Sequence, residues 1–282
     1  MQVCNTLEAL NLALQDYSGN SATIGFVPTM GALHMGHGSL FQQALAENDV
    51  VVVSIFVNPT QFNNAQDLEK YPRPFEQDIA FLTTIDPNII VFAPTAKELY
   101  KGSVTATSYN FGGIELAMEG ANRPGHFDGV GTVLNLLFRA VKPTHAYFGQ
   151  KDFQQLQIVR ALVELEQMPI TIVGCKIFRA ASGLAMSSRN MRLTAKQKNA
   201  APFIFKTLKQ AQTLFKTKSI PYVTRWVEAQ FKDHEILELE YFEIAAIHNL
   251  KTAQRKHAKN TYRGFIAVFA GTVRLIDNIA LN

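Results

Sequence analysis

Residues 24–37 read IGFVPTMGALHMGH, an apolar run followed by a glycine-containing loop with two histidines. The apolar run is typical of a short buried strand, and the residues from Ser39 onward favour a helix. A helix N-terminus presents unpaired N–H groups, so a strand, a glycine loop and a helix start predict a corner that binds phosphate. Gly31 and Gly36 allow the backbone to approach a bulky anion closely.

The two imidazoles of this corner, His34 and His37, are three residues apart and share one face of a first helical turn. His-x-Gly-His in this setting indicates a nucleotidyl-transfer site, where the imidazoles bind a triphosphate and stabilise charge as pyrophosphate leaves. Two half-exposed loop histidines are the alternative interpretation, because so short a motif is not specific by itself.

Composition sets wide bounds on fold and function. The chain has 282 residues, of which 47% are apolar and 18% are charged, as expected for a globular protein with a sizeable core. This length favours two domains. A net charge of +4 and a pI near 9.0 fit an anionic substrate such as ATP. The lysines and arginines are scattered rather than gathered in a stripe, which argues against a nucleic-acid partner.

Cys4 and Cys175 are too few for a disulfide framework and are expected to be free, buried thiols in a reducing cytoplasm. No signal peptide is recognised before Cys4, and the apolar runs at 50–53 and 265–270 are far too short to span a bilayer. We therefore expect a cytoplasmic protein with no membrane partner.

Predicted strands and helices alternate along the first 176 residues. The β-branched run at 49–57 is typical of a strand buried on both faces of a parallel sheet. The other predicted strands cover 23–28, 89–92, 145–148 and 170–174, and the predicted helices cover 7–15, 39–47, 76–83, 129–141 and 153–166. This order predicts a doubly wound, Rossmann-like α/β domain with right-handed crossovers.

The pattern changes after Cys175. Helices are predicted over 195–218 and 224–232, and strands of a small antiparallel sheet over 238–247, 265–270 and 273–276. We place the boundary near residues 175–180, which gives an α/β domain over 1–176 and a smaller α+β domain over 177–282.

Two further segments follow predicted strands. FVNPTQF at 56–62 brings the amides of Asn58 and Gln61 to the carboxyl end of a parallel strand, where such folds bind ligands. An exposed Asn-Pro turn is the alternative. In YFGQKDFQQLQ at 147–157, a lysine at a helix N-terminus opposes the helix dipole, so a partner is needed. An ATP phosphate suits Lys151, and a salt bridge to Asp152 or Glu119 is the alternative; Gln155 lies one turn later on the same face.

MSSRN at 186–190 places two hydroxyls and a guanidinium in a row, which suits a mobile anion clamp that becomes ordered on nucleotide. A solvated loop is the alternative. A Rossmann dehydrogenase is a competing function, yet the nearest match to its glycine motif, Gly129-Val130-Gly131, lacks the third glycine and the preceding strand.

Taken together, these residues resemble the pantothenate synthetase (pantoate–β-alanine ligase) family. The resemblance covers essentially the whole chain and rests on the order and spacing of PTMGALHMGH at 28–37, FVNPTQF at 56–62, YPR at 71–73, RPGHFDGVGTV at 123–133, YFGQKDFQQLQ at 147–157, GLAMSSRN at 183–190 and RLIDN at 274–278. Another adenylate-forming ligase or nucleotidyltransferase is the competing interpretation within enzymes of this type.

The resemblance implies that (R)-pantoate attacks the α-phosphate of Mg²⁺-ATP, releasing pyrophosphate and leaving pantoyl adenylate. The amine of β-alanine then attacks the adenylate, giving pantothenate and AMP. A Rossmann-like nucleotide- and pantoate-binding domain, a C-terminal lid domain and a homodimer are the expected architecture.

The resemblance also assigns site residues. The catalytic set is His34, His37, Lys151, Ser187, Ser188 and Arg189, with His37 as the proton donor. ATP-binding residues are Met30, Gly31, Ala32, Leu33, His34, Met35, Gly36, His37, Gly149, Gln150, Lys151, Asp152, Phe178, Met186, Ser187, Ser188 and Arg189. Gln61 and Gln155 bind pantoate, and Gln61 also reaches β-alanine. Met30 and Val133 supply apolar contact, and Asn58, Tyr71 and Arg123 are further candidates.

Some positions depart from the family pattern. Met35 stands where an acidic residue is common, and we expect its side chain to point away from ATP. Ala180 and Ser182 replace a Glu and an Asp, which could alter closure of the lid. Gln77 also falls where an acidic residue is common, so the protein ligands of Mg²⁺ are open and Asp78 is the candidate.

Overall fold

The computed structural model describes residues 1–17, 21–62, 68–69 and 71–282. By their internal contacts, these residues form two compact units. The large unit comprises Met1–Gln150 and Gln154–Lys176, and the small unit comprises Lys151–Phe153 and Ile177–Asn282.

The large unit is built on a six-stranded sheet in the order β1-β4-β3-β2-β5-β6, with every neighbouring pair parallel. Its strands are β1 (Gln2–Cys4), β2 (Ile24–Thr29), β3 (Val50–Ile55), β4 (Ile90–Phe92), β5 (His145–Gly149) and β6 (Thr171–Cys175). The chain order reverses between β2 and β5, so the carboxyl ends of β3, β2 and β5 meet at the switch point where ligands bind in such folds. The predicted doubly wound sheet is confirmed.

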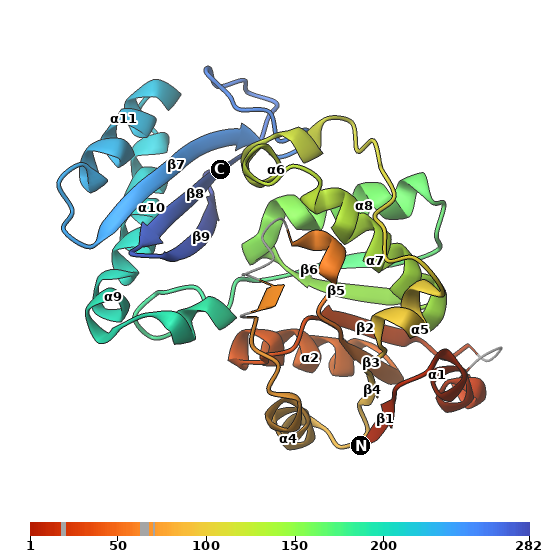
Figure 1. Cartoon of the computed structure of the whole chain (residues 1–282). Helices are drawn as coiled ribbons and strands as arrows, with labels where there is room; N and C mark the ends of the chain where they lie inside the picture. Colours follow the sequence, from red (N-terminus) through yellow and green to blue (C-terminus); the bar gives the residue numbers. More distant parts are fainter. Residues whose placement is uncertain (18–20, 63–67, 70) are drawn as a thin grey trace. The chain divides into compact units, whose positions relative to one another are not determined.

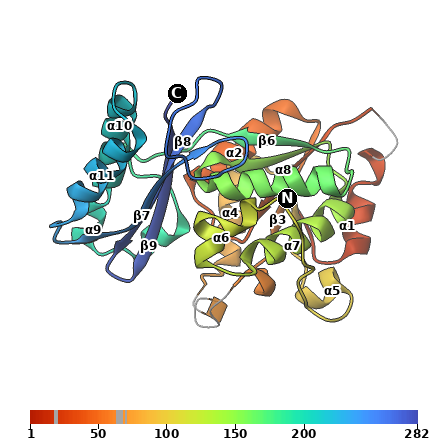
Figure 2. The ribbon, with the colours of Figure 1, turned by 90° about the horizontal axis from the view of Figure 1, so that it is seen from above.

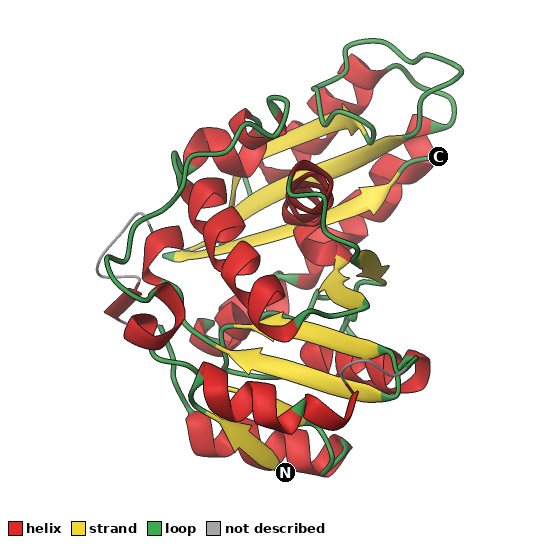
Figure 3. Cartoon of the chain, turned by 90° about the vertical axis from the view of Figure 1, so that its right-hand side faces the viewer, coloured by secondary structure: helices red, strands yellow, loops and turns green. Residues whose placement is uncertain are grey.

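Helices cover both faces of this sheet (Figure 1, Figure 3). They are α1 (Leu7–Ala13), α2 (Met35–Glu47), α4 (Phe75–Ile85), α5 (Ala96–Tyr100), α6 (Met118–Asn122), α7 (His126–Val141) and α8 (Phe153–Leu165), with short 3-10 turns η1 (Gln15–Tyr17), η2 (Pro59–Gln61), η3 (Ile114–Leu116) and η4 (Gln150–Asp152). Strand β2 is buried on both faces: Val27 joins a core with Phe41 of α2, whereas Phe26 packs edge-on against Phe138 of α7 at 6.1 Å. Neighbouring residues of a strand point to opposite faces, so this alternation fixes α2 and α7 on opposite sides.

The small unit contains a three-stranded antiparallel sheet of β7 (Leu237–Ala246), β8 (Tyr262–Ala270) and β9 (Val273–Ala280). Its remaining elements are η5 (Ser188–Arg192), α9 (Ala195–Ala200), α10 (Pro202–Phe215) and α11 (Ile220–Phe231). Helices α10 and α11 lie side by side and pack against the sheet (Figure 2). The predicted antiparallel sheet is confirmed.

Several predicted boundaries were wrong. Helix α2 begins at Met35 rather than Ser39, because His34 acts as its N-cap, and histidine is not among the side chains that usually signal a cap. Helix α7 begins at His126 rather than Gly129. The predicted helix over 195–218 is divided into α9 and α10 at Pro202, which lacks the N–H that a continuous helix needs. Helix α11 begins at Ile220, where Ser219 caps it.

The two cysteines are free and buried, as expected. Burial raises the pKa of Cys175 to about 12, so its thiol is protonated and unreactive at neutral pH. Across the described ranges, no helix is both long and apolar enough to cross a bilayer.

Candidate functional site

The loop after β2 is held by an internal carboxylate. Gly31 has φ of +80° and Ala32 has φ of +51°, and this left-handed turn directs successive N–H groups to one side. The N–H groups of Ala32 and Leu33 donate to the two oxygens of Asp78, at 2.9 and 2.7 Å. A Cβ on Gly31 would lie 2.9 Å from Asp78 Oδ2, so glycine is needed both for the angle and for the close approach.

Asp78 is a buried residue of α4 with 2% exposure. Burial raises the pKa of its carboxyl, and the two backbone N–H bonds oppose that rise by stabilising the charged form. Both oxygens are already acceptors, so this carboxylate positions the loop. Among the described residues no group of three or more His, Cys, Asp or Glu gathers as a metal site, and the metal-ligand role considered for Asp78 stays a prediction.

His34 and His37 form a reciprocal cap at the start of α2. Nδ1 of His34 accepts the N–H of Gly36 at 3.1 Å, and Nδ1 of His37 accepts the N–H of His34 at 3.3 Å. A ring nitrogen that accepts a hydrogen bond carries no proton, so the cap selects the tautomer of each imidazole that has its proton on Nε2. In that tautomer Nε2, rather than Nδ1, is the N–H donor of each ring.

The two rings stack with centroids 4.1 Å apart and an angle of 28° between their planes. The buried Phe41 supports the His37 ring at 6.4 Å, one turn further along α2. Met35, the residue between them in sequence, is 50% exposed. The imidazoles are thus a rigid pair rather than two loose loop histidines.

This geometry corrects the expected source of anion binding at the corner. The N–H groups of Ala32, Leu33, His34 and Gly36 all have acceptors within the protein. The expectation of unpaired N–H groups at the helix start was therefore wrong for these positions. Side chains of the corner, the two imidazoles among them, are then the candidates for binding a phosphate.

The segment after β3 brings Gln61 beside this corner. Nε2 of Gln61 lies 2.6 Å from the sulfur of Met30, at the end of β2. The buried Asn58 shapes the turn: its Nδ2 donates to the carbonyl of Gly129 at 3.0 Å, and its Oδ1 accepts the hydroxyl of Tyr100 at 2.6 Å. Asn58 therefore fixes the η2 turn that carries Gln61.

The carbonyl oxygen of Gln61 is contacted by side chains at the start of α7 and just before it. His126 Nδ1 lies 2.9 Å from the carbonyl oxygen of Gln61, and Arg123 Nη2 donates to the same oxygen at 3.2 Å. Tyr71 packs edge-on against Phe62 at 5.6 Å. Sequence reasoning missed Tyr100 and His126; His126 could have been found, since it stands in the RPGH run quoted above.

The segment after β5 contributes through α8. Gln150 Nε2 donates to the carbonyl of Gly174 at 3.0 Å, which fixes the turn at the end of the strand. Gln154 is buried and bonded to the backbone of Ile114, Ala117 and Glu119. The neighbouring Gln155 is half-buried. In the large unit, the imidazole pair, Gln61 and Gln155 thus belong to segments that follow three adjacent strands.

The small unit carries the second group of predicted residues. Lys151 Nζ lies 3.2 Å from Asp152 Oδ1, so the salt bridge considered as an alternative is present. The side chain of Asp152 is 46% exposed, and solvent screens a pair of this kind.

Residues 177–190 lead into the serine-arginine segment of the small unit. The N–H of Met186 donates to the carbonyl of Phe178 at 3.0 Å, and Phe178 is 39% exposed. Ser187 caps the short helix η5, and its Oγ accepts the N–H of Arg189 at 3.3 Å. At the departures from the family pattern, Ala180 and Ser182 lie in a turn in which Ser182 Oγ accepts the N–H of Leu184 at 3.5 Å.

Comparison with known proteins identifies the family. The sequence model described as pantoate-beta-alanine ligase matches residues 2–280. The chain belongs to the pantoate-beta-alanine ligase family. The pantothenate synthetase of Flavobacterium psychrophilum is 54% identical over 268 residues, which cover 95% of each chain.

Two solved structures of the ligase family are similar over the whole chain. Pantothenate synthetase from Thermus thermophilus has a TM-score of 0.90 at 35% identity, covering 100% of this chain and 99% of that chain. Pantoate-beta-alanine ligase from Francisella tularensis, in a complex with beta-gamma ATP and beta-alanine, has a TM-score of 0.80 at 35% identity, covering 100% and 98%.

The dehydrogenase alternative depended on Gly129 and Gly131 forming a glycine-rich loop after a strand. Their position in the structure does not fit that loop and agrees with membership of the ligase family. Gly129 and Gly131 lie inside α7, not after a strand. A Cβ on Gly129 would lie 2.3 Å from the carbonyl oxygen of Thr60, so this glycine lets α7 pack tightly against η2. The dehydrogenase interpretation is therefore wrong.

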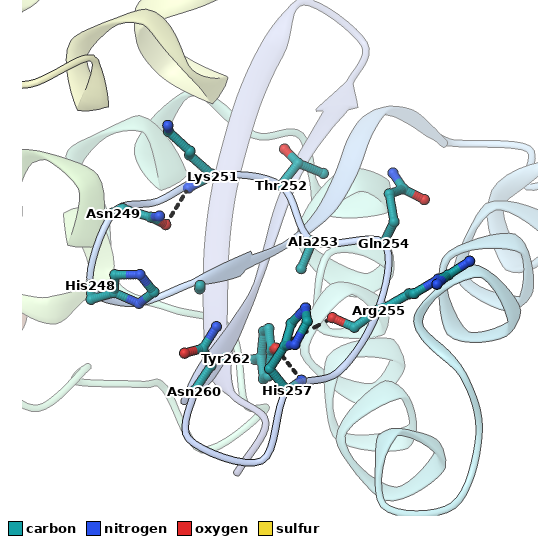
Figure 4. A pocket seen from close by; sticks show the side chains of 11 residues that line it. His248, Asn249, Lys251, Thr252, Ala253, Gln254, Arg255, His257, Asn260 and Tyr262 are labelled. Carbon is teal, nitrogen blue, oxygen red and sulfur yellow. Dashed lines mark hydrogen bonds between the residues drawn. The ribbon is translucent and has the colours of Figure 1, made fainter.

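A hollow of about 370 Å³ lies in the loop between β7 and β8 of the small unit (Figure 4). It is lined by residues between Ala246 and Tyr262, among them His248, Lys251, Arg255 and His257, and by none of the residues that the ligase family resemblance assigns. The side chains of Lys251 and Arg255 point away from one another. Their charges do not converge on an anion, so this hollow differs from a phosphate site.

Proposed function

We propose that this protein catalyses the ATP-dependent condensation of (R)-pantoate with β-alanine to give pantothenate, AMP and pyrophosphate, through a pantoyl adenylate. The observation that carries the proposal is the match of the pantoate-beta-alanine ligase model to residues 2–280. The relative from Francisella tularensis, solved with beta-gamma ATP and beta-alanine, supports the substrate class.

The first step joins a carboxylate to a phosphate, so catalysis depends on positioning and on neutralising negative charge. Gln61 and Gln155 bind the hydroxyls and carboxylate of pantoate, because an amide offers both a donor and an acceptor. Met30 and the buried Val133 supply the apolar contact for the gem-dimethyl group. The carboxylate oxygen of pantoate attacks the α-phosphorus, and the bond to pyrophosphate breaks.

The imidazole pair serves the leaving pyrophosphate. Nε2–H of His34 and of His37 donate to phosphate oxygens from rings that stack on one another and cap α2 through Nδ1. His37 is the donor that acts as charge develops on the leaving group. In the same proposal Lys151 exchanges its screened contact with Asp152 for a phosphate oxygen, and Ser187, Ser188 and Arg189 add hydroxyl and guanidinium donors.

In the second step the amine of β-alanine attacks the acyl carbon of the adenylate, and the acyl–phosphate bond breaks to release AMP. Gln61 reaches β-alanine as well as pantoate. In the domain organisation that we propose, residues 1–176 bind nucleotide and pantoate, and residues 177–282 form the lid. By their internal contacts, Lys151–Phe153 belong to the small unit.

A metal ion enters this reaction as part of the ATP complex. The described residues hold no acidic or imidazole cluster of three or more, and Asp78 is committed to backbone N–H groups. Mg²⁺ commonly keeps several waters and binds through substrate phosphates rather than a protein cage. The donor set fits a metal held by ATP, and we propose Mg²⁺ in that role. A homodimer in the cytoplasm completes the proposal, and light scattering of the purified protein tests the oligomeric state.

ATP–pyrophosphate exchange tests the order of the two steps. Because adenylation precedes attack by β-alanine, exchange of labelled pyrophosphate into ATP is expected with pantoate and Mg²⁺ but without β-alanine. Adding β-alanine should then yield pantothenate with AMP, not ADP, by mass spectrometry. Exchange that needs β-alanine would contradict a free-standing adenylate step, and AMP formation with another acid in place of pantoate would favour a different adenylate-forming ligase.

The serine-arginine segment is expected to become ordered on nucleotide. Replacing Ser188 and Arg189 with alanine should weaken use of ATP and raise AMP formed without pantothenate, because an open site admits water to the acyl phosphate. Hydrogen exchange across residues 180–192, with and without ATP and pantoate, measures the ordering directly. Equal protection in both conditions would contradict the lid role and leave the ligase proposal standing.

A further inference from the structure

Asp277 and Asn278 of the RLIDN run are adjacent polar residues near the end of β9, outside the predicted catalytic and binding set. Both are buried, at 5% and 2% exposure. As neighbours on a strand they point to opposite faces of the sheet. Each therefore reaches a different segment of the small unit, and each of these segments carries predicted site residues.

Asp277 holds the segment that leads to Ser187–Arg189. Its two carboxylate oxygens accept Nη1 and Nη2 of Arg179 at 2.6 and 2.8 Å, a bidentate pair with fixed geometry. The same guanidinium donates to the carbonyl of Gly183 at 3.2 Å and lies 3.7 Å from the centre of the Phe205 ring. The backbone of Arg179 also pairs with that of Ala185 as an isolated β-bridge, so the side chain and the backbone of one residue together close the turn directly before Met186.

Asn278 holds the segment that contains Lys151. Its Nδ2 donates to the carbonyl oxygen of Lys151 at 2.8 Å. Its Oδ1 accepts Nη1 of Arg263, and the guanidinium of Arg263 lies 4.0 Å from the centre of the Phe153 ring. Asn278 and Arg263 together thus contact both ends of the stretch from Lys151 to Phe153.

Burial of the charged side chain of Arg263 at this position costs desolvation free energy. It is 8% exposed, and its Nε has no acceptor among the described residues. Burial lowers the pKa of Arg263 to about 10, although the charge of Asp277 opposes this shift. An apolar side chain would fill a buried site at lower cost. The arginine instead makes directional contacts with Asn278 and Phe153, as expected of a group that fixes a segment in place.

We propose that Asp277 and Asn278 are positioning residues for adenylation, Asp277 acting on Ser187–Arg189 through Arg179 and Asn278 acting on Lys151 through its carbonyl. The inference rests on the proposed function, because its readout is the pantoate-dependent step. It joins two anion-binding segments, separated in sequence, to one dipeptide of β9.

The substitution Asn278→Asp tests the link to Lys151. It keeps an oxygen to accept Arg263 and replaces the amide donor by an oxygen that repels the Lys151 carbonyl. We expect kcat/KM for ATP in pyrophosphate exchange to fall by roughly 10–100-fold, as displacement of a catalytic group by about 1 Å commonly does, with KM for pantoate nearly unchanged. Glu240→Gln is the matched control: it breaks the 2.7 Å pair between Glu240 and Arg274 of β9 and is expected to leave exchange unchanged.

A double-mutant cycle separates positioning from general destabilisation. If Asn278 acts through Lys151, then Asn278→Asp should have almost no further effect in a Lys151→Ala background. The parallel cycle combines Asp277→Asn with Arg189→Ala and is expected to be equally non-additive. Additive effects in both cycles, or losses that follow a lowered unfolding temperature, would overturn the inference.

The unmodified protein separates this inference from the proposed function. Normal pantoate-dependent exchange by the unmodified protein, together with an unaffected Asn278→Asp variant, would overturn only the positioning role. Absence of exchange in the unmodified protein would overturn the proposed function and the positioning role with it.

Discussion

Replacement of His37 by alanine is expected to lower the rate of adenylation by roughly 10²–10³, the usual effect of losing one preorganised donor to developing charge. The Nδ1 atom of His37 is committed to the N–H of His34, and its ring stacks on His34. The proton on Nε2 is thereby held in one direction before substrate arrives. Pyrophosphate exchange with saturating ATP and pantoate measures the effect.

The cap and the catalytic donor can be separated at the same position. His37→Asn keeps an acceptor near the place of Nδ1 and removes the Nε2 donor, so it should restore most of the stability that His37→Ala loses, about 1 kcal/mol for a helix cap. Its exchange rate should remain as low as that of the alanine variant. Gln42→Ala, at an exposed position of α2, is the control and should behave normally. Full exchange by a folded His37→Asn protein would assign His37 to structure alone.

Replacement of Asp78 by asparagine is expected to damage both stability and catalysis. An asparagine can accept only one of the two N–H groups from Ala32 and Leu33, and its own amide then faces the other donor. A buried donor left without an acceptor costs about 1–3 kcal/mol. The loop that leads to His34 shifts as a result, and a misplaced catalytic group can reduce turnover by about 10²-fold. Thermal unfolding and pyrophosphate exchange measure the two effects.

The dependence of the exchange rate on Mg²⁺ distinguishes two roles of Asp78, namely positioning the loop after β2 and binding the metal. If Asp78 positions the loop, raising the Mg²⁺ concentration should leave the exchange rate of Asp78→Asn unchanged. Recovery of the rate at high Mg²⁺ would instead assign Asp78 to the metal. Glu76→Gln, at an exposed position in the first turn of the same helix, removes one carboxylate without touching the loop and is expected to match the unmodified protein.

The order of the elements could be predicted from local pattern. The run of β-branched residues at 50–53 has the composition of a strand buried on two faces, and β3 is indeed buried along almost its whole length. The alternation of such runs with helical stretches leads to a parallel sheet because right-handed crossovers leave few other arrangements. Boundaries were less predictable: the start of α2 depends on a histidine cap, whose geometry local propensity does not encode.

The identities of the candidate site residues could also be predicted from local sequence. His34, His37, Gln61 and Lys151 each stand in a short segment next to a strand end, and parallel strands bring their carboxyl ends to one edge. Adenylation of a carboxylate needs particular residue types at particular spacings, and the sequence specifies both.

The sequence alone therefore determined the fold class, the family resemblance and the candidate site residues. Tertiary structure decided what supports them: Asp78 accepts N–H groups from residues 46 and 45 positions away, and Asn278 donates to a carbonyl 127 positions away. Some of the donors and acceptors in these contacts are backbone atoms, which every residue possesses. The pattern of side chains in the sequence therefore does not predict these contacts. Only the folded chain, by bringing distant segments within hydrogen-bonding distance, specifies which buried polar group holds which loop.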